Sequence, residues 1–223
     1  MPSAPALRCD RCQRGYRCSM SLLHLDDVLA DVLKREALAS GIRLVGVDGP
    51  SGSGKSTFAR RLAARSHAPL IEIDDFVSWK NFAGWWPRFQ TQVLEPLHAG
   101  SDAHYQVRDW TNDEFGTSLN GWKTVAWAPL VILEGVTCSR LSAPDFLAFR
   151  VWVEAPADLR LNRGVARDGG THRQLWLDWM KEEHQFFADD RTRARADLRV
   201  DGNPSVTHDP ETEVVTLDWS TLD

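Results

Sequence analysis

Residues 49–56 read Gly-Pro-Ser-Gly-Ser-Gly-Lys-Ser and match the pattern G-x-x-x-x-G-K-[ST] at every fixed position. In such a loop the glycines let the backbone curl around phosphate groups with its N–H groups pointing inward. A helix that begins near Ser56 adds the positive end of its dipole. Lys55 supplies a point charge for the β- and γ-phosphates, and the Ser56 hydroxyl is placed to bind Mg²⁺. The pattern therefore predicts a phosphate-binding loop (P-loop) for ATP with Mg²⁺.

The segments on either side of the loop favour this interpretation over a glycine-rich turn with a chance lysine. Residues 42–47 form a short apolar run that predicts a buried strand, and residues 56–66 predict a helix. A P-loop requires a strand before it and a helix after it. The residues expected to hold the nucleotide are Gly49, Ser51, Gly52, Ser53, Gly54, Lys55, Ser56 and Thr57.

Two acidic positions follow other predicted strands. Glu134 ends the very apolar run 130–133, and Asp74 and Asp75 follow the run 70–73. An acid at the end of such a strand approaches Mg²⁺ in P-loop proteins, often through water, so Ser56 and Glu134 are the predicted metal ligands. The alternative for Glu134 is a strand-end acid that faces solvent.

A carboxylate at 74 or 75 could accept the proton of an attacking hydroxyl group. Ligands of α/β sheets bind beyond the carboxyl ends of the strands, which is where these two acids lie. Successive side chains alternate in direction, so only one is expected to be the base. The alternative is a helix N-cap aspartate.

Residues 74–127 are rich in Trp, Asp, Gly and Pro and have weak periodicity, apart from a predicted helix at 87–97. We interpret them as an insertion that covers the acceptor site, although for any single tryptophan there a place in a local core is favoured. Arg88 and Arg108 are the only cations between positions 83 and 120, which favours a neutral hydroxyl-bearing acceptor over a nucleoside monophosphate. The residues expected to contact the acceptor are Asp75, Trp86, Arg88, Asp109 and Trp110.

Arg160, Arg163 and Arg167 are spaced by three and four residues, so they share one face of a helix predicted at 156–166. Arginines suit a lid that closes over a transferring phosphoryl group and neutralises its charge. A solvated arginine face is the alternative. We expect Arg163 and Arg167, within a lid region at 156–170, to act in catalysis together with Lys55.

The alternation of apolar strands and helices predicts an α/β fold of the doubly wound type, with a mainly parallel sheet and helices on both faces. Residues 1–20 are expected to be a flexible tail and residues 21–223 a single domain. The further predicted strands are 150–153, 198–200 and 213–217, and the further predicted helices are 22–39 and 173–187.

The composition excludes several classes of protein. The formal net charge is −5, so the chain lacks the overall positive charge that would indicate binding to nucleic acid or to an anionic membrane. No run is long enough for a transmembrane helix, and the N-terminus lacks the apolar core of a signal peptide, so a cytoplasmic location is expected. Cys9, Cys12 and Cys18 could form a zinc site with His24 at loose spacing, or belong to a tail with reduced thiols.

The order of these elements resembles the uridine kinase-like P-loop kinases, and most closely a group of actinobacterial uridine kinase-like proteins. The resemblance covers about residues 40–201 and rests on the segments 49–57, 73–76, 109–110, 131–135 and 163–168. It implies that Asp74 is the acceptor base, that Arg163 and Arg167 belong to the lid, and that the loop at 202–204, with Gly202, lies near adenine.

The sequence also departs from that family. Asp75 replaces the small residue that is usual in true uridine kinases. The tyrosine and histidine that hold uracil there have no clear counterpart, because Tyr105 and His104 are displaced from them. The reaction type therefore carries over better than the substrate.

We interpret the chain as an ATP- and Mg²⁺-dependent kinase that transfers the γ-phosphoryl group to a hydroxyl of a nucleoside-like small molecule. The alternatives are a kinase of another small alcohol, such as a vitamin precursor or a sugar, and a nucleotide-binding protein or ATPase without kinase activity. The sequence contains neither the N-K-x-D motif of a GTPase nor the Leu-Ser-Gly-Gly signature of an ABC ATPase. The preference for ATP over GTP and the oligomeric state, a homo-oligomer included, stay open.

Overall fold

Seven strands form the central sheet of the computed structural model, which describes residues 17–142 and 146–220. Their order is β1-β9-β8-β7-β2-β6-β3. The pairs that join β3, β6, β2, β7 and β8 are parallel, and β9 runs antiparallel to both β8 and β1. The strands are β1 (Arg17–His24), β2 (Arg43–Asp48), β3 (Leu70–Glu72), β6 (Leu130–Glu134), β7 (Leu147–Glu154), β8 (Leu198–Asp201) and β9 (Glu213–Ser220).

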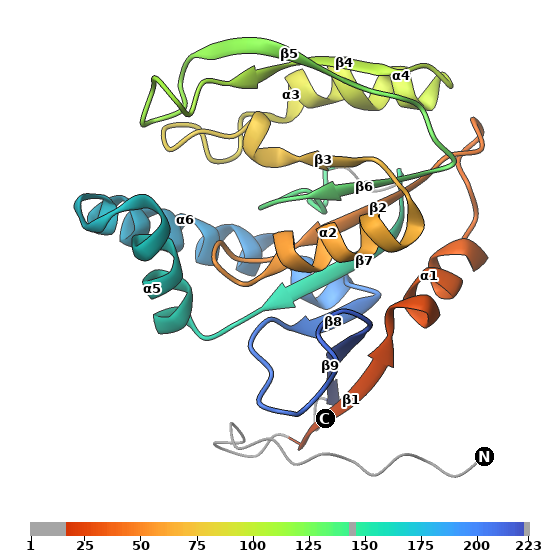
Figure 1. Cartoon of the computed structure of the whole chain (residues 1–223). Helices are drawn as coiled ribbons and strands as arrows, with labels where there is room; N and C mark the ends of the chain where they lie inside the picture. Colours follow the sequence, from red (N-terminus) through yellow and green to blue (C-terminus); the bar gives the residue numbers. More distant parts are fainter. Residues whose placement is uncertain (1–16, 143–145, 221–223) are drawn as a thin grey trace, which may run out of the picture.

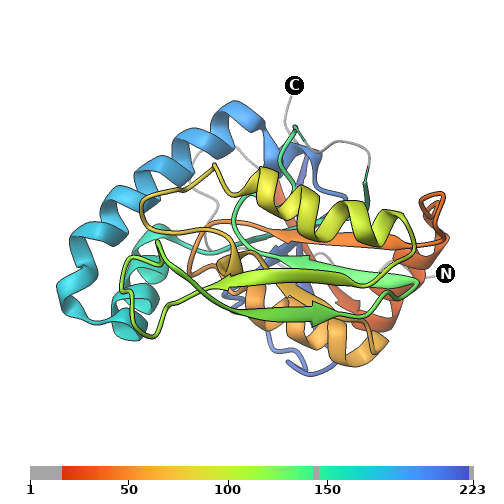
Figure 2. The same cartoon turned by 90° about the horizontal axis from the view of Figure 1, so that it is seen from above.

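Helices cover both faces of this sheet, which confirms the predicted doubly wound α/β architecture (Figures 1 and 2). The helices α1 (Leu25–Lys34) and α2 (Lys55–Ser66) pack on one face, and α6 (Arg173–Asp190) lies on the other. α5 (Ala157–Asp168) connects β7 to α6 through the short turn η3 (Gly170–His172). Because both faces are covered, the central strands β2 and β6 are apolar along almost their whole length.

The register of β2 and β6 sets the geometry of the site. Val45 pairs with Ile132 and Val47 with Glu134, so the carboxyl ends of the two strands lie side by side. Asp48 ends β2 and is almost fully buried. Its carboxylate accepts hydrogen bonds from the backbone N–H groups of Gly49, Thr137 and Ser139, so it ties the start of the P-loop to the turn after β6. Burial raises the pKa of Asp48 to about 6, and these three bonds oppose that rise.

The segment predicted as an insertion folds into a helical stretch and a hairpin beside β3 (Figure 1). Its elements are α3 (Trp86–Phe89), η2 (Gln90–Leu94), α4 (Glu95–His98), β4 (Ala103–Arg108) and β5 (Leu119–Val125). Phe76 joins them to the sheet, because its ring packs 5.2 Å from Phe89 and 4.9 Å from Tyr105, centroid to centroid. Much of the aromatic content of this segment is thus a local core.

The N-terminal boundary differs from the predicted one. The predicted helix at 22–39 is shorter in the structure, because β1 extends to His24 and pairs with β9 along its length, and α1 ends at Lys34. Of the expected tail, residues 1–16 lie outside the described residues, whereas 17–20 belong to β1. The side chains of Cys9, Cys12 and Cys18 also lie outside what the structure describes. The His24 ring accepts a hydrogen bond from the Asp26 N–H and so caps α1.

Candidate active site

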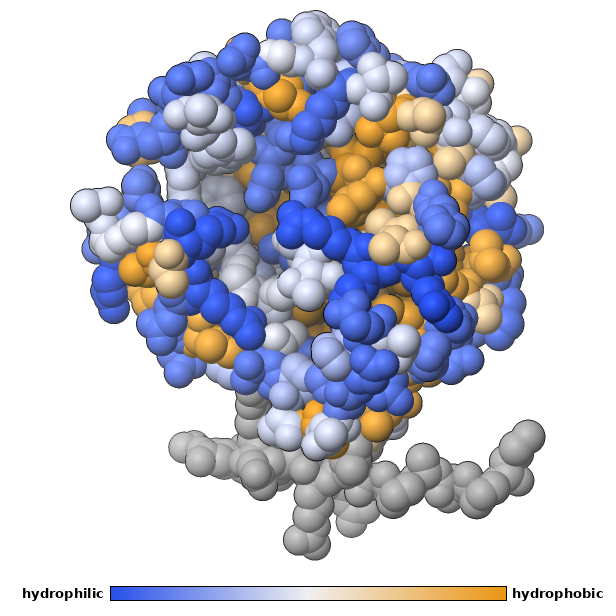
Figure 3. Space-filling view, viewed as in Figure 1, coloured by the Kyte–Doolittle hydropathy of each residue, from blue (hydrophilic) through white to orange (hydrophobic). Residues whose placement is uncertain are grey.

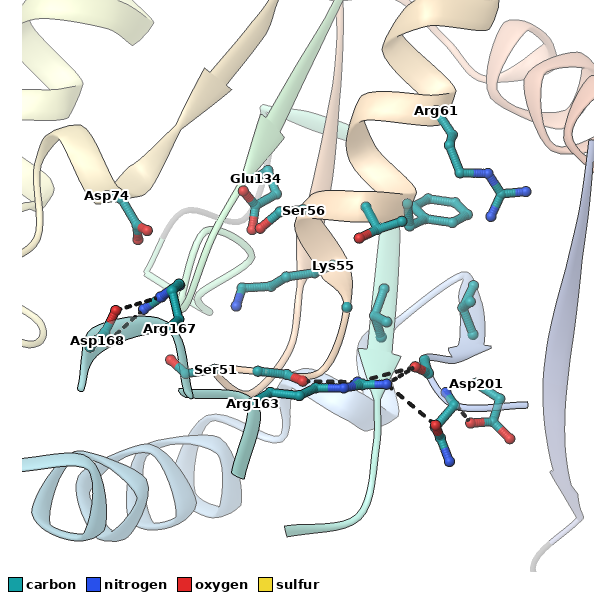
Figure 4. Close-up of a pocket in the computed structure, with 18 of the residues that line it drawn as sticks. Ser51, Lys55, Ser56, Arg61, Asp74, Glu134, Arg163, Arg167, Asp168 and Asp201 are labelled. Carbon is teal, nitrogen blue, oxygen red and sulfur yellow. Dashed lines mark hydrogen bonds and ion pairs between the residues drawn. The ribbon is translucent and has the colours of Figure 1, made fainter. Parts of the chain in front are cut away.

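A cavity of about 1010 Å³ lies at the carboxyl ends of the parallel strands, where an open α/β sheet binds its ligands. It extends from the P-loop to Trp110 on one side and to Val214 of β9 on the other. Figure 3 shows this face of the molecule hollowed and bordered mainly by hydrophilic residues. Figure 4 shows that side chains of the P-loop, β6, η1 (Ile73–Asp75) and α5 meet in it.

The P-loop has the conformation that a phosphate cradle needs. Gly52 has φ +76° and Gly54 has φ +102°, in the left-handed region that side chains disfavour. A Cβ at Gly52 would also lie 2.6 Å from the Arg160 carbonyl oxygen. α2 begins at Lys55, and Gly54 supplies no side chain to cap it. The first N–H groups of α2 therefore face the cavity without a side-chain acceptor, as anion binding requires.

The other predicted nucleotide-binding residues surround this cradle. Ser51, Ser56 and Thr57 line the cavity, as do Gly52, Gly54 and Lys55. Gly49 and Ser53 lie behind the lining and shape the loop. Gly202 follows β8 and also lines the cavity, where a Cβ would lie 1.7 Å from the Ser53 carbonyl oxygen. Only glycine therefore lets the β8 loop pack this closely against the P-loop.

Lys55, Ser56 and Glu134 converge at the centre of the cavity (Figure 4). Glu134 is buried and hydrogen bonds with Ser56. Burial raises the pKa of Glu134 to about 7, and the charge of Lys55 opposes the rise. A hydroxyl and a carboxylate side by side are hard oxygen ligands that suit Mg²⁺, which takes its other ligands from phosphates and water. These residues fit the predicted metal.

We expect Glu134→Gln to weaken the response of the protein to Mg²⁺. Glutamine keeps the size of the side chain but loses the negative charge that attracts the ion. The half-saturating Mg²⁺ concentration for ATP turnover should rise by about 10–100-fold, the range typical of groups that support a metal. Activity titrated with Mg²⁺ at fixed ATP measures this. The exposed Glu95→Gln on α4 is the control, and an unshifted Mg²⁺ profile for Glu134→Gln would contradict the assignment.

Asp74 and Asp75 point to different sides of η1. Asp74 is exposed to the cavity, and its carboxylate faces the central group (Figure 4). Asp75 is buried on the other side, where Lys123 contacts its carboxylate at 2.8 and 2.9 Å and the Tyr105 hydroxyl donates to it at 3.2 Å. Burial raises the pKa of Asp75 and Lys123 opposes this. Asp75 therefore anchors the hairpin and does not reach the cavity.

The three arginines of α5 have different surroundings. Arg160 and Arg163 form hydrogen bonds with the backbone of the P-loop. Arg160 donates to the Ser51 carbonyl, and Arg163 donates to the carbonyls of Gly52 and Gly202. Arg167 faces the cavity, where it forms a two-point ion pair with Asp168 at 2.7 and 3.0 Å. Of these arginines, Arg163 and Arg167 both line the cavity, and Arg163 also binds the loop backbone.

Of the five residues predicted to contact the acceptor, the cavity lining includes Trp110. Trp86 packs against Phe89 and Phe146 in the local core. Arg88 stacks on Phe76, and its guanidinium donates to the carbonyls of Gln106, Asp75 and Phe76. Asp109 accepts from Asn112 and Asn120 and holds its own loop together. Asp75, Trp86, Arg88 and Asp109 are therefore not among the residues that line the cavity, and the contacts that the structure gives them are structural.

Several residues that line the Trp110 end of the cavity were not predicted. Trp79 lines the cavity together with Trp176 and Trp179 of α6, and its ring lies 5.8 and 5.2 Å from theirs. Glu114 and His172 both line the cavity, and the Glu114 carboxylate lies 3.8 Å from Nε2 of His172. The spacing of three residues between Trp176 and Trp179 was a usable signal for one aromatic helix face.

Comparisons with known proteins agree with this fold. Residues 45–187 match the model of the AAA domain family. A protein from Bacillus stearothermophilus described as a possible uridine kinase has a similar structure, with 19% identity, a TM-score of 0.59, and coverage of 78% of this chain and 96% of that one. The YGR205w protein is also similar, with 12% identity, a TM-score of 0.54, and coverage of 89% and 96%.

At these identities the structural likeness shows a shared P-loop NTPase-like fold and nothing about the substrate. No curated protein matches the chain. Within residues 17–142 and 146–220, none of the helices combines the length and the apolar character needed to cross a bilayer.

Proposed function

The chain belongs to the AAA domain family, and from this premise we propose that it is an ATP- and Mg²⁺-dependent kinase of a small molecule with a hydroxyl group. One observation carries the proposal. A P-loop lysine, a hydroxyl–carboxylate pair and a separate carboxylate face one cavity that extends beyond the phosphate cradle. The phosphate cradle would bind the nucleotide, and Asp74 lies where a second substrate would approach the phosphates.

The nucleotide would lie with its phosphates in the P-loop and its adenine toward Gly202 and the β8–β9 loop. Lys55 and the first N–H groups of α2 would hold the phosphate oxygens. Ser56 and Glu134 would hold Mg²⁺. When bound there, Mg²⁺ supplies positive charge that neutralises the β- and γ-phosphates.

The transfer step needs a base and positive charge. Asp74 would take the proton of the acceptor hydroxyl as its oxygen bonds to the γ-phosphorus, while the bond from that phosphorus to the bridging oxygen breaks and ADP leaves with the electron pair. Lys55 and Arg167 would stabilise the charge on the transferring group. We propose that Arg163 assists by fixing the P-loop against the β8 loop.

The acceptor end of the cavity supports an uncharged, ring-bearing acceptor. Trp79, Trp110 and Trp176 offer aromatic surface there. Arg167 is assigned to the transferring phosphoryl group, and His172 faces Glu114, so an acceptor phosphate would find no further arginine or lysine among the lining residues of this end. A nucleoside such as uridine is our first proposal, and a sugar or a vitamin precursor is the second.

An acceptor screen tests the function. The protein is incubated with Mg·ATP and one compound from a panel of nucleosides, sugars and vitamin-precursor alcohols, and both ADP and the phosphorylated product are measured. A kinase gives ADP and phosphorylated product in equal amounts, and both depend on the acceptor. ADP formed together with inorganic phosphate, at a rate that no acceptor changes, would instead identify an ATPase.

A further inference from the structure

Glu183 of α6 is a buried carboxylate that the proposed reaction does not use. Its side chain is about 2% exposed, although it belongs to a helix whose neighbouring positions 182 and 184 face solvent. One carboxylate oxygen accepts from the Ser51 backbone N–H at 2.7 Å and from the Trp179 indole N–H at 2.8 Å. The other lies 3.4 Å from the Arg160 guanidinium. A buried charge is retained at low cost only when donors surround it in this way.

The contact with Ser51 matters because of how the loop distributes its N–H groups. Gly49 donates to Asp48, Ser51 donates to Glu183, and Ser53 donates to the Pro50 carbonyl. Among the described hydrogen bonds, the N–H groups of Gly52 and Gly54, each of which follows a satisfied donor, have no protein acceptor. The donors that the protein satisfies thus alternate with donors left for a ligand. Glu183 is the acceptor for Ser51, the middle one of the three N–H donors that the protein satisfies.

Glu183 also fixes the wall beside the loop. The Trp179 indole N–H that it accepts lies 2.9 Å from the Ser51 hydroxyl, so Glu183, Trp179 and Ser51 form one hydrogen-bonded triangle. The Trp179 ring packs edge-on against Trp79 and Phe82 at the acceptor end of the cavity. A single carboxylate on α6 therefore connects the phosphate cradle to the aromatic wall.

We propose that Glu183 is a positioning residue of the phosphate cradle. By holding the Ser51 N–H from outside, it keeps the N–H groups of Gly52 and Gly54 turned toward the phosphates before the nucleotide arrives. Without it, the half-buried Ser51 N–H would lose its acceptor, and the loop would turn to satisfy it. This inference rests on the nucleotide site of the proposed function but is independent of the acceptor.

Calorimetric titration with Mg·ATP and with AMP tests the role. Glu183→Ala should weaken Mg·ATP by about 10–100-fold, the effect of losing a hydrogen-bonded charged group. AMP lacks the β- and γ-phosphates, so Glu183→Ala should weaken AMP binding much less. The fold-loss of affinity for AMP should be smaller than that for ATP by a factor of about 5 or more. Glu183→Gln keeps an oxygen for Ser51 and Trp179 and should stay within about 5-fold of the wild type. Glu182→Gln, the same change on the exposed neighbour, should leave ATP binding unchanged.

A second variant covers the case in which Glu183→Ala does not fold, as judged by circular dichroism. Trp179→Phe keeps an aromatic ring in the wall but removes the indole N–H, and should weaken Mg·ATP by about 3–10-fold. Wild-type ATP affinity in the folded variant would overturn the proposal, and so would equal losses for ATP and AMP. If the wild type binds Mg·ATP but phosphorylates no acceptor, the kinase assignment fails while this inference stands. If the wild type does not bind Mg·ATP, both fail.

Discussion

Lys55→Ala is expected to remove most phosphoryl transfer while the fold survives. Lys55 is only 7% exposed, and its amine points into the cavity where the phosphates would bind, near enough to Glu134 for its charge to oppose the rise in the pKa of that carboxyl (Figure 4). In so enclosed a site a fixed positive charge interacts with the developing negative charge much more strongly than it would in water. The expected loss is on the order of 10³-fold or more in kcat/KM.

The fold should tolerate this change because the strands and helices around the P-loop are held by apolar packing and by backbone bonds to Asp48. Thermal unfolding and circular dichroism check that point. Lys34→Ala, which removes an exposed lysine from α1, is the control and should keep wild-type turnover. Turnover of Lys55→Ala close to that of the wild type would remove the basis for the whole phosphate site.

The P-loop side of the site could be predicted from the sequence because the motif requires particular secondary-structure elements on either side of it. A strand must precede the loop and a helix must follow it, so Lys55 and Ser56 can occupy only one place in an α/β sheet. Glu134 was predicted because it ends a very apolar strand, and the structure places that strand end beside the end of β2. For these residues local pattern and global fold agree, and the sequence was sufficient to place them.

The acceptor side could not be predicted because residue type does not give side-chain direction in an irregular segment. Arg88 and Trp86 looked like ligands for a substrate, yet both are used by the local core around Phe76 and Phe146. The wall of the cavity instead combines Trp79 with two tryptophans almost a hundred residues later on α6. The spacing of the two later tryptophans indicates a shared helix face, but only tertiary packing brings Trp79 to it, so the sequence does not predict the wall as a whole.

At the start of the domain, too, the local sequence pattern did not predict the secondary structure correctly. Leu25, Val28 and Val32 keep the helical spacing that predicted a helix, and all three are buried in α1. The preceding residues share that apolar character but pair with β9 instead. Whether an apolar run becomes a strand depends on a partner some 190 residues away, and tertiary pairing overrides the local pattern.

Asp74→Asn should lower kcat by roughly 10²–10⁴-fold, the usual contribution of a general base. Asparagine has nearly the same shape but cannot take the proton of the acceptor hydroxyl. The backbone at this position is held independently, because the Trp110 indole N–H donates to the Asp74 carbonyl at 2.8 Å. The substitution should therefore remove the proton acceptor without moving the chain. ATP affinity should stay almost unchanged, since the phosphates are held by the P-loop.

Asp75→Asn is the matched control, because it makes the same chemical change one residue away. Asp75 faces Lys123 and Tyr105 outside the cavity, so its loss should act on the hairpin. Lys123 is half exposed, which limits the loss of stability to about 1–2 kcal/mol, and kcat should stay within about 10-fold of the wild type. Urea unfolding, kcat with an acceptor from the screen and the ATP dissociation constant separate the two effects. If Asp75→Asn lowers kcat more than Asp74→Asn does, the base is not Asp74, and the roles of the two aspartates must be exchanged.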